Sequence, residues 1–301
     1  MEIKYLHHSE IDYKKWEACI CSSMNVSVYG HAWFLDSVSK NWSAMILDDY
    51  KAVLPVFVTS DNKLTLPDFI LWTGIYSHGI LDKEVYKKFL TFVADNFRCV
   101  DLALDKYFQV PTLKIGCFSK HHVYEFDVIK SLKKRFSLDS ALVKRLKARS
   151  IEKGFTVERV ADPINVNIFL QLHTQYNFKE IDTLENIVEV CTKRRGCVMY
   201  YLKDGNGKIS GLVVAVFVEN YIFVPFLKIV KKFPKMMGQM IMINHLMSYF
   251  EGCPGIMVLD YEKLDISGRL LEGMGAKKFV YPRYRVNAWT KFVNMFHFSK
   301  I

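Results

Sequence analysis

Residues 221–250 read YIFVPFLKIVKKFPKMMGQMIMINHLMSYF. The first ten residues are typical of a β-strand, and a lysine-rich loop containing Gly238 leads from them into an apolar helix. A helix that begins directly after a strand points its unpaired backbone N–H groups and its positive dipole end towards the connecting loop. The order therefore predicts a cradle for a phosphate-bearing molecule; the alternative is a lysine-flanked turn before a methionine-rich core helix.

The bulk composition predicts a globular protein. The 301 residues are enough for one large domain or two ordinary ones, and the 50% apolar and 14% aromatic content supports a sizeable core. No run of about 18 uncharged apolar residues occurs, and the N-terminus lacks the layout of a signal peptide. We therefore expect no membrane span and a cytoplasmic location. Seven cysteines without a CxxC pair predict reduced, mostly buried thiols.

The formal net charge is +10, from 41 lysines and arginines against 31 aspartates and glutamates. Much of the excess lies in residues 130–149 and 228–235. Such a balance favours polyanionic partners, namely nucleotide cofactors, nucleic acid or anionic membrane surfaces. The alternative is a solvated basic surface that keeps the protein soluble, and charge alone does not name the partner.

Hydrophobic periodicity predicts two mixed α+β halves, with a domain boundary between residues 129 and 130. The second half (130–301) is expected to contain helices at 137–153, 163–178, 184–193, 236–250 and 267–274, and strands at 155–159, 197–203, 209–219, 221–230, 255–259 and 277–285. The first half (1–129) shows a shorter version, with helices at 12–21, 31–40 and 83–97, and strands at 43–48, 50–59, 99–104 and 122–128. Each domain is thus predicted to be a mixed, mostly antiparallel sheet flanked by helices.

The strand–loop–helix order resembles the GNAT superfamily of N-acyltransferases. In that family a (Gln/Arg)-x-x-Gly-x-(Gly/Ala) loop after a strand holds the pyrophosphate of an acyl-coenzyme A. This chain offers Lys235-Met-Met-Gly238-Gln-Met240, with a basic first position, the central glycine and a bulky last position. The resemblance implies an acyl-coenzyme A co-substrate bound by Lys228, Lys232, Lys235, Met237, Gly238, Gln239 and Met240.

Two further segments resemble the Fem-type members, which are tandem-domain relatives that transfer aminoacyl groups. They are the closing run 264–287, LDISGRLLEGMGAKKFVYPRYRVN, and the run 29–56, YGHAWFLDSVSKNWSAMILDDYKAVLPV. The resemblance implies two tandem GNAT-like domains. The chain departs from the Fem pattern because residues 154–197 leave no room for a long helical hairpin arm. The first domain lacks a glycine loop, so we expect it to bind no cofactor.

Acyl transfer to an amine requires a base, a proton donor for the leaving group and a polarised carbonyl. Asp260 and Tyr261 follow a buried strand at its C-terminal end, where sites gather in α/β sheets, and Glu219 precedes the strand 221–230. These three are the candidate catalytic residues. The alternatives are a loop cap for Asp260, a packed ring for Tyr261 and a hairpin turn for Glu219.

A segment of the first domain with Trp72, Tyr76 and His78 is similar to a Fem-like stretch, and these residues are expected to line a substrate cleft. A structural role for a single histidine in an apolar segment is the alternative. The histidine pairs at 7–8 and 121–122 are adjacent, so their side chains diverge on a strand, and no metal site is predicted. The sequence has no Gly-x-Ser-x-Gly elbow, Walker loop or zinc spacing, which argues against a hydrolase, a phosphate-loop NTPase and a zinc protein.

The leading hypothesis is an N-acyltransferase that moves an acyl group from acyl-coenzyme A to a small-molecule or other amine acceptor. One alternative is a Fem-type aminoacyltransferase that uses aminoacyl-tRNA, although the missing helical arm favours acyl-coenzyme A. The other is a non-catalytic binding protein with a GNAT fold. No DNA partner is expected, and the sequence specifies neither the acceptor, the acyl group nor the oligomeric state.

Overall fold

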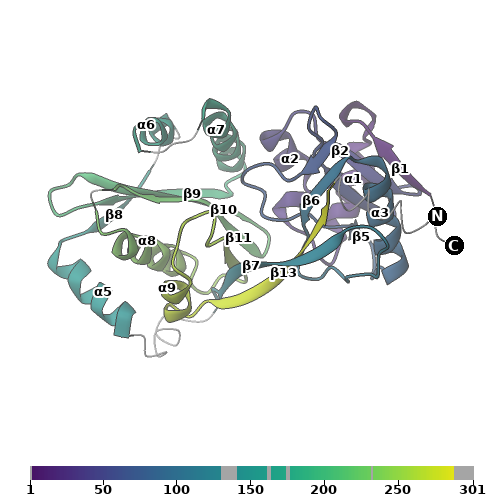
Figure 1. Ribbon diagram of the computed structural model, residues 1–301. Coiled ribbons are helices and arrows are strands. Elements are labelled where there is room, and N and C mark those ends of the chain that lie inside the picture. The colour runs from purple at the N-terminus through teal and green to yellow at the C-terminus, as the bar shows by residue number, and fades with distance from the viewer. Residues whose placement is uncertain (1, 130–140, 161–163, 174–176, 232, 288–301) are drawn as a thin grey trace. The chain divides into compact units, whose positions relative to one another are not determined.

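A computed structural model describes residues 2–129, 141–160, 164–173, 177–231 and 233–287. Internal contacts divide the chain into two compact units, Met1–His121 with Val280–Ile301, and His122–Phe279. Strands β7 (Cys117–Asp127) and β13 (Lys277–Val286) each contribute residues to both units. A boundary at 129/130 would instead have placed each of these strands in a single domain. The two units are described separately below (Figure 1).

The first unit contains an antiparallel sheet in the order β1-β2-β3-β5. A second group of strands pairs β4 in parallel and β13 antiparallel with β6. The remaining strands of this unit are β1 (Ile3–Leu6), β2 (Ser43–Leu47), β3 (Ala52–Val56), β4 (Lys63–Thr65), β5 (Tyr76–Ser77) and β6 (Cys99–Ala103). Its helices are α1 (Tyr13–Cys21), α2 (Ala32–Val38) and α3 (Lys83–Asn96), with short 3₁₀ turns at His8–Glu10 and Val28–Gly30.

The core of the first unit follows from its sequence pattern. Every residue of β2 and β3 is buried, as expected for strands that are apolar throughout. Helix α3 buries Val85, Phe89, Leu90 and Val93, whose three- and four-residue spacing places them on one face. These side chains pack with the sheet into a single hydrophobic cluster. The first unit is therefore held together by one amphipathic helix against an apolar hairpin.

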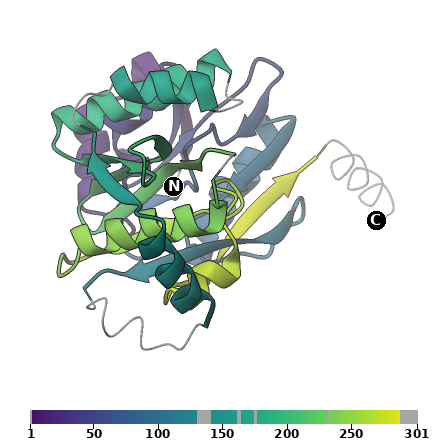
Figure 2. The same cartoon turned by 90° about the vertical axis from the view of Figure 1, so that its left-hand side faces the viewer.

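The second unit contains strands in the order β7-β12-β11-β10-β9-β8, of which only the β11–β12 pair is parallel among those described. Helices α8 and α5 lie on one face of the sheet, and α6 and α7 lie on the other (Figures 1 and 2). The elements are β8 (Thr156–Arg159), β9 (Cys197–Lys203), β10 (Ile209–Val218), β11 (Tyr221–Ile229), β12 (Ile256–Leu259), α5 (Ala141–Glu152), α6 (Ile164–His173), α7 (Phe178–Lys193), α8 (Lys235–Tyr249) and α9 (Gly268–Gly273).

The start of helix α7 differs from the sequence prediction by six residues. Helix α7 begins at Phe178 rather than at residue 184, because Asn177 caps it. The Asn177 side chain accepts a hydrogen bond from Glu180 N at 3.0 Å, and the Glu180 carboxylate accepts one from Asn177 N at 2.7 Å. This reciprocal capping box starts α7 earlier than the hydrophobic pattern alone indicates.

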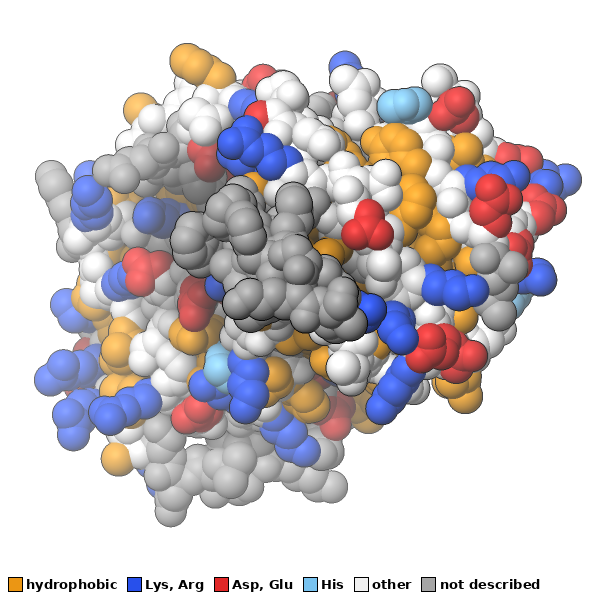
Figure 3. Space-filling model, turned by 45° about the vertical axis from the view of Figure 1, so that its right-hand side comes forward, with side chains coloured by type: hydrophobic (Ala, Val, Ile, Leu, Met, Phe, Trp, Pro, Cys, Tyr) orange, Lys and Arg blue, Asp and Glu red, His pale blue; other side chains and the backbone are white. Residues whose placement is uncertain are grey.

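None of the described helices has the length and the apolar content that a membrane span requires. On the face drawn in Figure 3, lysine and arginine side chains are interspersed with aspartate and glutamate. The net positive charge of the sequence is therefore not gathered into one basic area on that face.

Candidate functional site

Strand β11 separates from one neighbour while it stays paired with the other. It pairs with β10 along its length, except for a β-bulge in which Val224 and Pro225 lie opposite a single residue, Ala215. With β12 it pairs only from Tyr221 to Phe223, and β12 ends at Leu259. From Val224 onwards β11 therefore has no partner on the β12 side among the described strands. We call this opening, along residues 224–229, the wedge.

Along the wedge, alternate N–H groups of β11 point away from β10. Val230 N donates to Ser210 O at 2.9 Å, so the even-numbered residues near the end of β11 bond to β10. The alternation of an antiparallel ladder then directs the N–H groups of Leu227 and Ile229 away from β10, towards the wedge. An extended ligand with amide or carbonyl groups can pair with these atoms as an added strand does.

The N-terminus of α8 follows the wedge after a short loop. Pro234 occupies the N-cap position without a side-chain hydrogen bond, and the first turn contains no acidic residue. The N–H groups of Lys235, Met236 and Met237 are the donors that have no acceptor within a helix at these positions. Gly238 N is already used, because it donates to Pro234 O at 3.0 Å. Three amide donors and the positive end of the helix dipole therefore favour an anion here.

Gly238 serves helix–sheet packing. A Cβ at this position would lie 2.8 to 3.1 Å from three carbon atoms of the Ile229 side chain. A Cβ on Gly211 of β10 would also lie 2.7 Å from Ile229 Cδ1. The two glycines thus let Ile229 fill the space between α8 and the strands. This packing role is independent of the expected contact of Gly238 with a phosphate, which stays a prediction.

Lys235 and Gln239 hold the loop around Asp265. The Lys235 ammonium group forms an ion pair with the Asp265 carboxylate, and Gln239 Nε2 donates to Asp265 O at 3.0 Å. The Gln239 side chain is buried, whereas the ion pair is exposed. These contacts fix the loop that follows β12 against the first turn of α8, so the two residues shape the site from its side.

The other residues proposed for the acyl donor differ in what they offer. Met237 and Met240 are buried, so only their backbones are candidates for contact with a ligand. Lys228 is half-buried on the face of β11 opposite to Leu227 and Ile229. Lys232 lies outside the described residues.

Asp260 and Tyr261 directly follow Leu259, the last residue of β12, where β11 and β12 separate. Asp260 is buried, and its Oδ1 accepts hydrogen bonds from Glu262 N and Lys263 N, both at 3.1 Å. Tyr261 OH donates to Glu262 Oε1 at 2.9 Å, and this hydrogen bond is the main reason that the pKa of Tyr261 is raised. Asp260 therefore shapes the turn, while Tyr261 presents a protonated hydroxyl group.

Two residues near this turn were not expected from the sequence. Tyr124 of β7 lies opposite Leu259, packs its ring edge-on against Tyr261 at 5.4 Å, and donates its hydroxyl to Glu272 Oε1 at 2.8 Å. Burial, with the nearby Glu272 carboxylate, raises the pKa of Tyr124 to about 12. Tyr124 and Glu272 are 148 residues apart in the chain, and neither belongs to a motif that would have indicated the contact.

Glu219 is not part of this constellation. It is exposed in the turn between β10 and β11, with a positive φ of 52°. The paired register of β11 and β12 runs only from Tyr221 with Ile256 to Phe223 with Val258, so Glu219 precedes its first pair and Asp260 follows its last, at opposite ends of the paired segment. The structure therefore supports the turn interpretation for Glu219.

Trp72 and Tyr76 are core residues of the first unit, with 3% and 1% exposure. The Trp72 ring packs against those of Tyr29 and Tyr281 at 5.1 and 4.8 Å, and Tyr76 OH shares a 2.9 Å hydrogen bond with Ser27 Oγ. Neither ring is accessible to a substrate. His78 is exposed and lies 3.3 Å from Ser22 Oγ. The predicted lining of a substrate cleft is thus corrected for the two aromatic residues, because burial takes their rings away from solvent.

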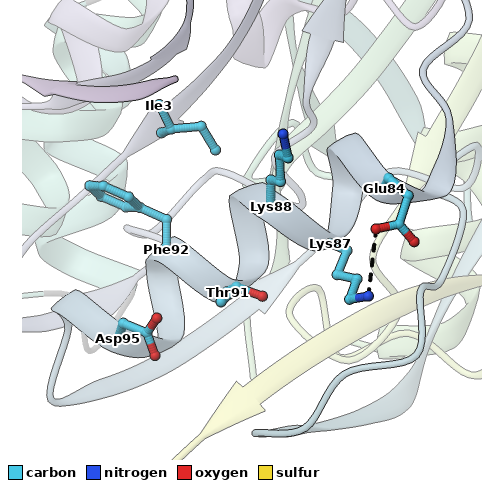
Figure 4. Close-up of a pocket in the computed structure, with 7 residues that line it drawn as sticks. All are labelled: Ile3, Glu84, Lys87, Lys88, Thr91, Phe92 and Asp95. Carbon is cyan, nitrogen blue, oxygen red and sulfur yellow. Dashed lines mark hydrogen bonds and ion pairs between the residues drawn. The ribbon is translucent and has the colours of Figure 1, made fainter. Parts of the chain in front are cut away.

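A groove of about 350 Å³ on the first unit is a weaker candidate site (Figure 4). Most of its lining comes from the solvent-facing side of α3, and Lys87 and Glu84 pair there across one helical turn at 3.5 Å. The lining residues are Ile3, Glu84, Lys87, Lys88, Thr91, Phe92 and Asp95. Mixed and mutually paired charges on one helix give such a groove no preference for an anionic or a cationic ligand.

Comparison with solved structures identifies the fold. FemX superimposes with a TM-score of 0.58 over 97% of this chain and 99% of its own, at 9% identity. This chain has a Fem-like, tandem GNAT-type fold. The C-terminal domain of a lysylphosphatidylglycerol synthetase from Agrobacterium fabrum superimposes at 0.56 with 10% identity, covering 94% of this chain and 95% of that domain. A tandem GNAT protein from the clavulanic acid biosynthesis pathway superimposes at 0.51 with 6% identity, covering 95% and 99%.

The likeness is one of structure. No protein-family model matches the sequence, and no curated protein is significantly similar to it. At these identities the superpositions show the fold, and they assign no substrate to the GNAT-type chain.

Proposed function

We propose that this protein is a transferase that passes an acyl group from an acyl-coenzyme A to an amine. The observation that carries the proposal is the wedge in β11 together with the uncapped N-terminus of α8 directly after it. The first offers amide donors for an extended chain, and the second offers three N–H groups and a helix dipole for the pyrophosphate. The FemX and tandem GNAT neighbours have the same type of fold, which supports this assignment of the site.

In this proposal the amides of Leu227 and Ile229 bind the extended arm of the donor and orient its thioester. Tyr261 is protonated at neutral pH, as an ordinary tyrosine is, and the hydrogen bond to Glu262 raises its pKa further, so its hydroxyl can supply a proton to the departing thiolate. The buried Asp260 holds the turn that positions Tyr261 through its bonds to Glu262 N and Lys263 N. The proton that the amine nitrogen loses passes through solvent to restore the Tyr261 hydroxyl, so the transfer yields the N-acylated amine and free coenzyme A.

The second candidate is an aminoacyl-tRNA-dependent transferase. It is favoured by the superposition on FemX and on the lysylphosphatidylglycerol synthetase domain over more than nine-tenths of the chain. The anion site at α8 would then hold a phosphate of the tRNA end, and binding would weaken steeply with salt. A third candidate is a protein that binds such a donor without turnover.

Met236 provides a sharper test of the anion site than Gly238. A side chain at Gly238 would strike Ile229, so a loss of binding by such a variant would also report misfolding. Met236 is 37% exposed at the second position of α8. Met236→Glu places a carboxylate at the helix N-terminus, where it is compatible with the helix dipole and competes with a bound phosphate. Met236→Gln has the same shape without the charge and is the matched control.

Thermal shift should be measured with acetyl-coenzyme A, longer acyl-coenzymes A and bulk tRNA, at low and at high salt. A ligand at 100 times its Kd adds about 2.7 kcal/mol of stability. We expect an acyl-coenzyme A to raise the Tm of the wild type and of Met236→Gln, and to bind Met236→Glu at least about 10-fold more weakly, which is 1.4 kcal/mol. A salt-sensitive shift with tRNA alone would favour the second candidate. No shift with any of these ligands would contradict both transferase assignments.

A further inference from the structure

Three side chains that can bind a metal ion converge in the first unit. Glu17 and Cys21 lie four residues apart on α1 and so share one face of the helix. His31 directly precedes α2. One potential ligand atom from each residue lies within 4.8 Å of the other two, and Glu17 Oε2 is 2.8 Å from His31 Nδ1. The sequence prediction of no metal site rested on the adjacent histidine pairs and on the absence of zinc-like spacing, and it did not include this group.

The surrounding contacts hold two of the ligands in place. Glu17 Oε1 accepts a hydrogen bond from Ala32 N at 2.7 Å, which turns Oε2 towards the imidazole. Trp16 Nε1 donates to Gly30 O at 2.9 Å and ties the segment before His31 to α1. The Trp33 ring stacks on the His31 ring with a centroid distance of 5.9 Å. Contacts of this kind around metal ligands fix their orientation and raise affinity.

The chemistry of the donor set selects the class of ion. Magnesium and calcium prefer all-oxygen coordination, whereas thiolate and imidazole ligands suit zinc and similar borderline-soft divalent ions. We propose that Glu17 Oε2, Cys21 Sγ and His31 Nδ1 bind one zinc-class divalent ion. Three protein ligands are typical of zinc sites that keep a fourth position for water or another ligand. Cys21 is exposed, so this position faces solvent.

Binding requires small, defined changes. The Cys21 thiol gives its proton to solvent, and the imidazole carries its remaining proton on Nε2, so that Nδ1 donates its lone pair to the ion. The hydrogen bond between Glu17 and His31 is replaced by bonds from both residues to the metal. Two ligand atoms at about 2.0 Å from a tetrahedral zinc ion lie about 3.3 Å apart. The 2.8 Å separation of Glu17 Oε2 and His31 Nδ1 therefore has to open by roughly half an ångström.

The test uses the full-length protein, stripped with a chelator and titrated with Co²⁺ as a spectroscopic substitute for zinc. We expect one equivalent of Co²⁺ to bind and to give the near-ultraviolet absorption of a cobalt–thiolate bond, and Zn²⁺ to displace it. Cys21→Ser should remove this absorption and weaken Co²⁺ binding at least about 10-fold, because the loss of a residue that only hydrogen-bonds to a metal ligand already weakens metal binding by about that much. Cys253→Ser changes another exposed cysteine, in the second unit, and should leave both unchanged.

A further variant separates the charge of the ligand from its place in the fold. Glu17→Gln retains an amide oxygen that can accept from Ala32 N but loses the carboxylate, so we expect weaker Co²⁺ binding with an unchanged far-ultraviolet spectrum. Absence of the cobalt–thiolate absorption in the wild type, or its survival in Cys21→Ser, would overturn the proposal. These readouts are independent of any transferase activity.

Discussion

The N-termini of α3 and α8 differ in the charges and hydrogen-bond acceptors that lie beside their unpaired backbone N–H groups. At α3, the Asp82 side chain accepts a hydrogen bond from Val85 N at 2.9 Å, and Glu84 adds a second carboxylate to the first turn. At α8, Pro234 provides no such bond and Lys235 adds a positive charge. A helix N-terminus already neutralised by its own carboxylates has no need of an external anion, whereas an uncapped one favours it. This difference makes α8, rather than α3, the candidate for an anion site.

The same contrast extends to buried groups. In the first unit the carboxylate of Asp105 is buried and accepts hydrogen bonds from Asn25 Nδ2 at 3.0 Å and Tyr107 N at 2.8 Å. Gly74 lies so close that a Cβ there would be 2.5 Å from Asp105 Oδ2. The Asp105 carboxylate is thus used inside the fold of the first unit, whereas in the second unit the buried Asp260 follows the end of β12, next to the point where β11 leaves it. Four measurements test the comparison, from the largest expected effect to the smallest.

The largest effect concerns Asp105. Burial raises the pKa of Asp105 to about 6 from an ordinary value of 3.8. The folded state therefore favours the protonated acid, and the free energy of unfolding falls as the pH rises from about 4 through about 6. Relative to the wild type, Asp105→Asn should gain about 2–3 kcal/mol between pH 4 and pH 7. Urea unfolding of both proteins across this range measures the difference; a pH-independent difference would mean that Asp105 is not a strained buried acid.

The next effect concerns the contact between α8 and β11. Gly238→Ala gains about 1 kcal/mol in helix propensity but forces a Cβ against the stiff, branched Ile229 side chain. Overpacking of this kind costs about 1–3 kcal/mol, so we expect net destabilisation. In an Ile229→Ala background the same change should become neutral or stabilising. A double-mutant cycle by chemical unfolding measures the coupling, and additive effects would show that Ile229 is not the obstacle.

The side-chain cap of α3 is expected to contribute less to the free energy of unfolding than the contact between α8 and β11. Asp82→Ala removes the acceptor for Val85 N and should lower the free energy of unfolding by about 1 kcal/mol.

The reverse change at α8, Pro234→Asp, supplies an N-cap carboxylate and should reduce binding of an acyl-coenzyme A without destabilising the fold. Chemical unfolding and thermal shift with ligand measure the two effects. Equal ligand binding by Pro234→Asp and the wild type would argue against an anion site at α8.

The smallest effect concerns the exposed ion pair between Lys235 and Asp265. Its side chains retain 49% and 79% exposure, and pairs of this kind contribute about 0–1 kcal/mol. Lys235→Met should therefore change stability by less than about 1 kcal/mol. If the Asp265 loop borders the donor site, the same variant should nevertheless weaken ligand binding. An unfolding curve and a ligand titration distinguish the two roles, and unchanged binding would confine Lys235 to the loop.

Much of the fold could be predicted from the sequence, because strands and helices leave periodic patterns in a single segment. The order of elements from 197 to 259, the strand–loop–helix at 221–250 and the tandem Fem-like arrangement all came from such local patterns and their resemblance to a family. Boundaries were less accurate where a side chain decides them, as Asn177 does for α7. The hydrophobic pattern continues through such a cap and does not mark it.

The candidate site was only partly predictable. Asp260 and Tyr261 were found because the end of a buried strand is visible in the sequence, but the partnership of Tyr124 with Glu272 joins distant segments. Glu219 was expected from its place before the strand 221–230, and Trp72 and Tyr76 from the resemblance of their segment to a Fem-like stretch; the structure places the first in a turn and the other two in the core. Residue type indicates which chemistry is possible, whereas burial decides whether the group is accessible.

By itself the sequence determined the strand β11, the loop and helix α8, because periodicity and turn residues act within one segment. Tertiary structure alone decided where β11 leaves β12, since strand pairing depends on residues more than thirty positions apart. It also decided that Gly238 leaves room for the Ile229 side chain, and that ligand atoms of Glu17, Cys21 and His31 lie within 4.8 Å of one another. Local geometry is encoded in neighbouring residues, but contact between segments is set by the packing of the whole unit.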